Sequence, residues 1–217
     1  MKEFQDERRR MVDEQLRARG LKDERLLVAF RDTPRHLFVP EEFRQDAYAD
    51  RPLPIGSAQT ISQPYMVALM VDRLRLKGHE RVLEIGGGSG YQTAILSQLA
   101  LDVFSVERLP ELLAAARERL TTLGYLNVHF TAGNGSLGWS EHAPYDAIIV
   151  SAAAPSVPQS LIDQLAEGSR MVLPIGPPEG QMLIEVEKRR GAVSQKPVAS
   201  CVFVPLVGEY GWPPVVE

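Results

Sequence analysis

The stretch that decides the fold is Val82-Leu83-Glu84-Ile85-Gly86-Gly87-Gly88-Ser89-Gly90. Its first half is a short apolar run of the kind that forms a buried strand, and its second half is a glycine-rich turn. Residues 91–99, which follow, have the pattern of a helix. In an open parallel sheet, a glycine turn between a strand and a helix N-terminus is a usual place for a nucleotide-like ligand.

On either side of this stretch, short apolar runs alternate with helical segments. Further strands are predicted at 103–107, 128–131, 146–150 and 170–174, and helices at 110–123 and 158–166. Strands that alternate with helices predict a parallel sheet with helices on both faces. Near the C-terminus, the runs 182–188 and 198–207 flank the turn-rich segment 190–197 and predict a closing antiparallel hairpin at one edge. The predicted fold class is therefore α/β, with a Rossmann-like, doubly wound, mostly parallel sheet.

The N-terminal part of the chain has a different pattern. It predicts a helix that ends at Gly20, a short second helix capped by Asp23, and a helix that starts at or just after Pro64. Between them, residues 51–64 carry three prolines and a glycine, which predicts an ordered loop. We expect one domain over 1–217, made of an N-terminal helical cap and loop, 1–75, and an α/β core, 76–217.

Composition excludes several classes of protein. The formal net charge is −4, which argues against a nucleic acid as the main partner. Cys201 is the only cysteine, so no internal disulfide can form, as expected for a reducing compartment. The chain shows neither a signal-peptide pattern nor an apolar run long enough to cross a bilayer, and its four histidines lack metal-ligand spacing. We expect a cytoplasmic, monomeric protein that uses no metal and does not bind a membrane.

Two cofactors compete for the glycine turn. The dinucleotide fingerprint Gly-x-Gly-x-x-Gly fits Gly86 and Gly88, but it places the bulky Tyr91 where a small residue is needed. The spacing Gly86-x-Gly88-x-Gly90, preceded by Glu84, resembles motif I of class I S-adenosylmethionine-dependent methyltransferases. That resemblance implies that Ser89 and the three glycines lie against the amino-acid part of S-adenosylmethionine.

Two later positions are consistent with a nucleoside. Glu107 ends the second strand, and its carboxylate can accept hydrogen bonds from both ribose hydroxyls. It predicts a ribose without choosing between the two cofactors. The turn Gly133-Asn134-Gly135 follows the third strand, where methyltransferases usually contact the adenine, although a plain turn explains it equally well.

The N-terminal third points to a particular family. Four motifs resemble the leader of protein-L-isoaspartate O-methyltransferases: Gln15-Leu16-x-x-Arg19-Gly20, Pro34-Arg35-His36-x-Phe38-Val39-Pro40, Ala47-Tyr48-x-Asp50, and the run from Leu53 to Ala68, LPIGSAQTISQPYMVA. Later matches at 83–92, 144–150, 152–154 and 203–206 extend the resemblance over nearly the whole chain. Two positions depart from the pattern: Ala58 and Asn134 stand where the family usually has Gly and Asp. Asn134 can still reach the adenine amino group through its carbonyl oxygen, and Ala58 affects the loop if its φ must be positive.

The resemblance implies a repair reaction. The substrate is a protein or peptide with an L-isoaspartyl residue, whose free α-carboxylate takes the methyl group and leaves S-adenosylhomocysteine. The methyl ester then cyclises to a succinimide without the enzyme, and hydrolysis restores some normal aspartate. Because a carboxylate is already ionised at neutral pH, the reaction needs alignment more than acid–base catalysis.

The resemblance also assigns the site. Ser62 is the catalytic residue, whose hydroxyl donates a hydrogen bond to the substrate carboxylate, and the alternative is that it caps the helix at Pro64. Gln59, Thr60, Ile61 and Gln63 complete a loop over cofactor and substrate. The expected cofactor contacts are Glu84, Gly86, Gly88, Ser89, Gly90, Glu107, Asn134 and Gly135.

Three rival functions share parts of this pattern. A methyltransferase for a small molecule or RNA has the same core but a different N-terminal cap. A nicotinamide-dependent oxidoreductase is disfavoured by Tyr91, and a non-catalytic binding module is favoured only by Ala58 and Asn134. Methylation of an isoaspartyl peptide, but not of its aspartyl counterpart, distinguishes the repair enzyme from all three.

Overall fold

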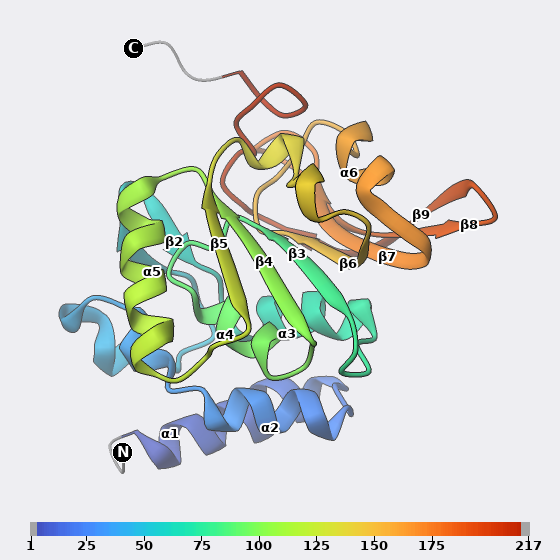
Figure 1. Cartoon of the computed structure of the whole chain (residues 1–217). Helices are drawn as coiled ribbons and strands as arrows, with labels where there is room; N and C mark the ends of the chain where they lie inside the picture. Colours follow the sequence, from blue (N-terminus) through green and yellow to red (C-terminus); the bar gives the residue numbers. More distant parts are fainter. Residues whose placement is uncertain (1–3, 214–217) are drawn as a thin grey trace.

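A central sheet organises the molecule (Figure 1). The computed structural model describes residues 4–213, and within them seven strands pair in the order β5-β4-β3-β6-β7-β8-β9. The first five are mutually parallel, whereas β8 is antiparallel to β7 and β9 is antiparallel to β8, so the predicted fold class is confirmed. The strands are β3 (Arg81–Ile85), β4 (Asp102–Glu107), β5 (Val128–Ala132), β6 (Tyr145–Val150), β7 (Leu165–Ile175), β8 (Gln181–Arg189) and β9 (Ala192–Cys201).

The strand order reverses between β3 and β6. From β3 the chain proceeds outward to β4 and β5, then returns to place β6 on the other side of β3. Crevices beyond the carboxyl ends of strands at such a reversal are where open α/β sheets bind ligands. The glycine turn that follows β3 therefore lies at the predicted place.

Helices cover the sheet on two faces, and the N-terminal helices form a further layer outside α3 and α4 (Figure 1). One core cluster joins α2, α3 and α4 to Val82, Val103 and Ile149 of the sheet. The second cluster, on the opposite face, joins Leu83 and Ile85 to α6. The α-helices are α1 (Gln5–Arg10), α2 (Glu24–Asp32), α3 (Pro64–Leu74), α4 (Tyr91–Ser97), α5 (Pro110–Thr122) and α6 (Gln159–Gln164). Short 3-10 or π segments are η1 (Met11–Leu16), η2 (Arg17–Arg19), η3 (Arg35–Phe38), η4 (Glu41–Asp46), η5 (Gly135–Leu137) and η6 (Ser140–His142).

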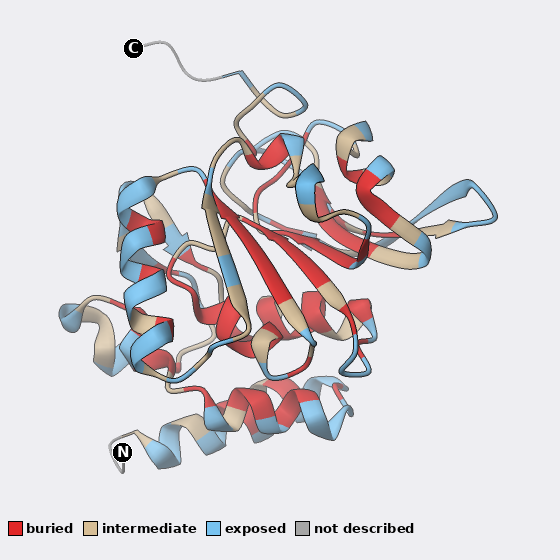
Figure 2. Cartoon of the chain, in the orientation of Figure 1, coloured by how far each residue is buried: buried red, intermediate tan, exposed pale blue. Residues whose placement is uncertain are grey.

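Burial on both faces explains why the central strands are mostly apolar. Figure 2 shows buried residues along β3, β4 and β6 and on the sides of α2 and α3 that face the sheet. Because successive side chains point to opposite faces, a strand covered on both sides has no exposed position for a polar residue. Glu84 is a buried exception within β3.

The N-terminal helices follow the predicted boundaries closely. Gly20 ends the first helical stretch in a left-handed conformation, with φ +94°, although this stretch contains the π-helical η1. Asp23 caps α2 by accepting the backbone N–H of Arg25 at 2.9 Å. Pro64 is the first residue of α3, where its missing N–H costs nothing.

The predicted loop at 51–64 is partly wrong, because it contains a hairpin. β1 (Leu53–Gly56) pairs with β2 (Gln59–Ile61) in an antiparallel ribbon. A two-stranded ribbon tolerates proline because each strand has a free edge. Ser57 and Ala58 form the tip with φ +50° and +54°, so both adopt the left-handed conformation of a tight hairpin turn.

Two further boundaries differ from the predictions. α6 ends at Gln164, and Gly168, predicted to stop a helix, lies within β7 where the register against β6 shifts. Its φ of +81° suits a bulge, which is a common use of glycine in strands. The turn predicted at 190–197 is only Arg190 and Gly191, so β9 spans Ala192–Cys201 instead of 198–207.

Candidate active site

A cavity of about 320 Å³ lies beyond the carboxyl ends of β3 and β4. Distant parts of the chain line it: the β1–β2 hairpin and the residues after it, the turns after β3 and β4, Gly135 after β5, Ser151 and Ala152 after β6, and a C-terminal segment, 204–207. Residues 204–207 were not singled out as site residues by sequence reasoning, because nothing local marks a segment that packs across the sheet. The cavity therefore brings the leader motif and the glycine turn together.

The glycine turn presents bare backbone to the cavity. Gly86, Gly88 and Ser89 line it as expected. Gly90 lies behind the lining, where a β-carbon would stand 3.0 Å from Leu120 of α5. Gly90 is the residue before α4 and has a φ of +85°, which glycine adopts without strain. Because it has no side chain, it also lets the turn pack closely against α5.

Glu107 lies in the cavity wall and is 8% exposed. One carboxylate oxygen accepts the backbone N–H of Gly88, and the other accepts that of Leu109, each at 2.9 Å. A carboxylate offers about four lone-pair directions, so both oxygens keep capacity for ribose hydroxyls. Exposed backbone beside such an acceptor fits the nucleoside of S-adenosylmethionine.

Glu84 does not line the cavity. It is fully buried beneath the turn, and its carboxylate accepts hydrogen bonds from Thr93 at 2.6 Å, Ser105 at 2.8 Å and Gln92 at 3.1 Å. Burial raises the pKa of Glu84, against the lowering effect of these three donors. Glu84 thus braces the turn, and the cavity is reached instead by Gln92, which also donates to Ser151 at 2.8 Å.

The turn after β5 contributes one of its two predicted residues to the cavity. Gly135 lines it, but Asn134 does not. The carbonyl oxygen of Asn134 accepts the backbone N–H of Ser136 at 3.0 Å and its hydroxyl at 2.8 Å, so both lone pairs are used. Adenine recognition through that oxygen stays a prediction that this geometry does not favour.

Residues 59–62 line the same cavity as the glycine turn, whereas Gln63 lies outside the lining. Gln63 occupies the cap position of α3 without a side-chain cap bond. The backbone N–H of Tyr65 is bonded at 3.2 Å by Asp50, so the alternative in which Ser62 caps this helix finds no support. Within residues 4–213, the Ser62 hydroxyl has no hydrogen bond of its own.

The leader motifs fix this segment in place. Gln15 donates to the carbonyl of Tyr48 at 2.7 Å, and His36 bonds the Tyr48 hydroxyl at 2.8 Å. Arg19 pairs with Asp50 at 2.6 Å and lies 3.3 Å from the centre of the Tyr65 ring. These residues of the first three motifs therefore hold residues 47–65 in place, and the fourth motif supplies residues that line the cavity.

Among residues 4–213, no group of three His, Cys, Asp or Glu side chains is placed to hold a metal ion. A family model described as "Protein-L-isoaspartate(D-aspartate) O-methyltransferase (PCMT)" matches residues 6–211. The chain belongs to this family. Its S-adenosylmethionine-dependent methyltransferase activity and its carboxyl-methylating function follow from that membership.

Relatives and solved structures agree with the family. A protein-L-isoaspartate O-methyltransferase from Methanoculleus marisnigri is 54% identical over 95% of this chain and 94% of its own length. One from Syntrophus aciditrophicus is 53% identical over 98% and 99%. A solved protein-L-isoaspartate O-methyltransferase superposes with a TM-score of 0.84 at 30% identity, covering 94% of this chain and 67% of its own. A Plasmodium falciparum member, in complex with S-adenosyl-L-homocysteine, gives 0.80 at 27% identity, covering 92% and 98%.

Proposed function

We propose that this protein-L-isoaspartate O-methyltransferase binds its cofactor over the glycine turn and holds the isoaspartyl α-carboxylate against residues 59–62. The observation that carries the proposal is that these two segments line the same cavity. Glu107 accepts the ribose hydroxyls, and Gly86, Gly88 and Ser89 contact the amino-acid part of the cofactor. Thr60, Ile61 and Ser62 form the wall for the substrate.

The residues of the chain mainly align and enclose the reactants. When bound, the cofactor supplies an activated methyl group on a sulfonium. The substrate carboxylate is ionised near pH 7, so no residue has to remove a proton. Ser62 donates a hydrogen bond to the oxygen that stays unmethylated and orients the other oxygen, which forms the new bond to carbon as the carbon–sulfur bond breaks. Residues 59–62 and 204–207 exclude water from the pair, and alignment of this kind is worth about 7–11 kcal/mol in favourable cases.

The decisive test compares two peptides. An L-isoaspartyl peptide and its aspartyl counterpart, each incubated with enzyme and methyl-labelled cofactor, should give base-labile methyl ester from the first alone. Equal labelling of both peptides would favour the rival methyltransferases. So would stronger labelling of RNA or of a small molecule than of the isoaspartyl peptide.

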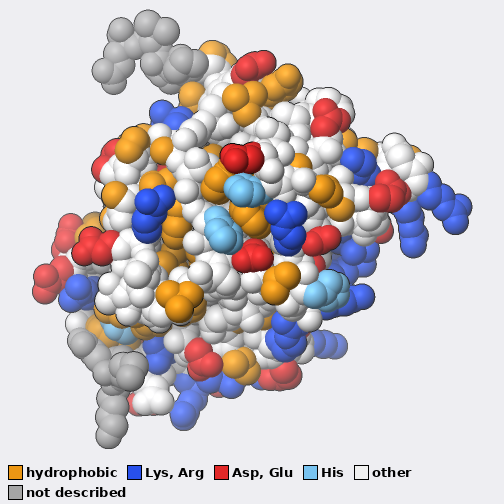
Figure 3. Space-filling view, viewed as in Figure 1, with side chains coloured by type: hydrophobic (Ala, Val, Ile, Leu, Met, Phe, Trp, Pro, Cys, Tyr) orange, Lys and Arg blue, Asp and Glu red, His pale blue; other side chains and the backbone are white. Residues whose placement is uncertain are grey.

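We also propose that the enzyme acts as a cytoplasmic monomer on damaged proteins, without a nucleic acid or a membrane as partner. The net charge of −4 and the single cysteine support this. On the face seen in Figure 3, acidic and basic side chains are interspersed, with basic side chains gathered near the tip of the β8–β9 hairpin. Within residues 4–213, no helix has the length and apolar character needed to span a membrane. Light scattering during gel filtration should give the mass of one chain.

A further inference from the structure

Arg35 is a fully buried charge that the reaction scheme does not use. It lies on η3 with an exposed fraction of 0%. Its Nε donates to the carbonyl of Ala47 and its Nη2 to the carbonyl of Ser62, both at 2.7 Å. Among the residues that the structure describes, its Nη1 is buried without a well-formed hydrogen bond, although the neutral phenol of Tyr91 lies near enough to stabilise the guanidinium. Two carbonyl acceptors leave the positive charge itself without a counterion.

The acids around Arg35 do not compensate this charge. No ion pair to Arg35 is found within residues 4–213, and Asp50, which attracts it weakly, is paired with Arg19 at 2.6 Å. Burial lowers the pKa of Arg35 to about 10, so the side chain stays protonated at neutral pH. An unpaired buried charge is costly for a fold, and such costs concentrate at functional sites.

The position of the charge relates it to the cavity. Arg35 bonds the backbone of Ser62, and its guanidinium carbon lies 4.7 Å from the centre of the Tyr91 ring. Both Ser62 and Tyr91 line the cavity. The positive charge of Arg35 therefore lies directly behind two residues that line the cavity, Ser62 and Tyr91.

We propose that Arg35 is the positioning residue of the carboxylate subsite: its hydrogen bond fixes Ser62, and its unpaired charge attracts the isoaspartyl α-carboxylate to this wall. The inference rests on the proposed function. Methyl transfer removes the negative charge of the carboxylate and the positive charge of the sulfonium together. The charge of Arg35 therefore favours the bound substrate more than the transition state, whereas its bond to Ser62 acts on turnover.

The charge can be tested by binding alone. Dissociation constants are measured for an isoaspartyl peptide and for its α-carboxamide counterpart, each added to the enzyme saturated with S-adenosylhomocysteine. The preference is the dissociation constant of the carboxamide peptide divided by that of the carboxylate peptide, and for the wild type it should exceed one. Arg35→Gln should reduce this ratio at least about fivefold, because interactions with a charged group in a low-dielectric interior have effects of this size. The affinity for S-adenosylhomocysteine should stay within about twofold, because Arg35 lies on the substrate side.

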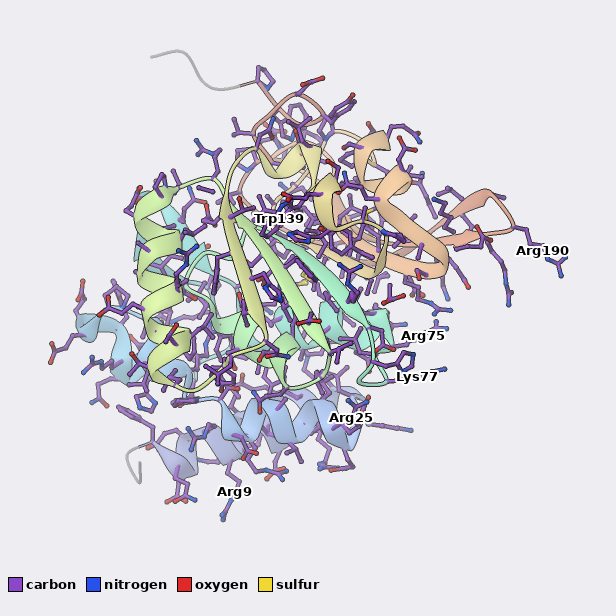
Figure 4. All side chains as sticks on the ribbon, viewed as in Figure 1. Arg9, Arg25, Arg75, Lys77, Trp139 and Arg190 are labelled. Atoms are coloured by element: carbon purple, nitrogen blue, oxygen red, sulfur yellow. The ribbon has the colours of Figure 1, made fainter. Side chains whose placement is uncertain are left out.

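Arg25 supplies a control with the same kind of acceptors, although it is exposed where Arg35 is buried. Its guanidinium also donates to two carbonyls, those of Leu76 at 3.2 Å and Leu99 at 3.3 Å, but it lies on α2 near Lys77 (Figure 4). Neither Arg25 nor its acceptors line the cavity. Arg25→Gln should lower stability without changing the preference for the carboxylate.

Arg35→Lys separates charge from hydrogen bonding. Lysine keeps the charge but cannot donate in a fork, so the preference should stay within about twofold of wild type while kcat falls at least about fivefold. A folded Arg35→Gln enzyme with an unchanged preference overturns the proposal. If Arg35→Gln does not fold, Arg35→Lys decides instead. The proposal is overturned if Arg35→Lys leaves kcat unchanged, or if it abolishes the preference for the carboxylate. A wild-type enzyme that fails to prefer the isoaspartyl carboxylate contradicts the proposed function itself.

Discussion

At the scale of single residues, Ser62 is the side chain on which turnover depends most directly. Ser62 lines the cavity, and its hydroxyl is not engaged in capping α3. Ser62→Ala should lower kcat by about tenfold or more, because a hydrogen bond to a charged group is worth about 1.5–3 kcal/mol. Isotope-label assays give kcat, and calorimetry should show little change in cofactor affinity. Ser57→Ala, on the same hairpin but outside the cavity lining, should retain turnover; equal losses in both variants would contradict the role of Ser62.

Glu107 is the acceptor on which cofactor affinity depends. Glu107→Ala removes the predicted ribose contact and also frees the backbone N–H groups of Gly88 and Leu109. Titration calorimetry should show binding of S-adenosylhomocysteine weakened at least about tenfold. Glu118→Ala, an exposed change on α5, serves as the control and should bind as wild type does. If Glu107→Ala binds S-adenosylhomocysteine as tightly as the wild type does, Glu107 does not bind the ribose.

Glu84 should make stability depend on pH. Burial raises its pKa in the folded state above the ordinary value of 4.5. Between pH 4.5 and the raised pKa, the folded protein therefore binds more protons than the unfolded chain. Its contribution to the free energy of unfolding therefore declines as pH rises from about 4.5 through the raised value, and it is level above that value. The difference in unfolding free energy between wild type and Glu84→Gln, followed by urea denaturation from acid to neutral pH, should decrease accordingly. A difference that increases with pH would mean that the three hydrogen bonds outweigh burial.

At the scale of elements, the β1–β2 hairpin has a residue poorly suited to its turn. Ala58 has φ +54°, a conformation that costs a residue with a β-carbon about 1 kcal/mol. Ala58→Gly relieves this cost but gains entropy in the unfolded chain, so we expect about 0.5 kcal/mol of stabilisation. Chemical denaturation measures the change. Ala114→Gly, exposed within α5, should have the opposite sign and cost about 1 kcal/mol, and stabilisation in both variants would contradict the argument.

The elements also show what the sequence could and could not predict. β3, β4 and β6, α4 and α5 follow from local apolar patterns and glycines, and their predicted bounds are nearly right. The hairpin and the bulge at Gly168 were missed, because proline and glycine punctuate loops and strand edges alike.

Most of the site residues that the sequence predicted line the cavity, but the contacts that some of them make were not predicted. Motif spacing found Gly86, Gly88 and Glu107, and the family resemblance found Ser62; all four line the cavity. Neither showed that Glu84 and Asn134 bond within the protein, because their partners depend on which side chains the fold brings into reach. Residues 204–207 were likewise invisible as part of the site, since they reach the cavity across the whole sheet.

At the scale of the whole molecule, we expect the cap 1–75 and the core 76–217 to unfold together. One core cluster includes Met11, Phe30 and Leu69 from the cap with Val82 and Ile149 from the sheet, so neither part keeps its interior without the other. Calorimetric and van't Hoff enthalpies should agree, and tryptophan fluorescence and circular dichroism should report one midpoint. Saturating S-adenosylhomocysteine, at about 100 times its dissociation constant, should raise stability by about 2.7 kcal/mol without splitting the transition. Two separate transitions would show two domains.

The assembly of the cavity from segments far apart in the chain has a consequence for biosynthesis. A ribosome adds about 5–20 residues per second, so roughly 7–30 s pass between the synthesis of Ser62 and that of Val204. During this interval the nascent chain has the hairpin and the glycine turn but not residues 204–207, which line the same cavity. The enzyme therefore cannot enclose its methyl donor until these last lining residues have been synthesised.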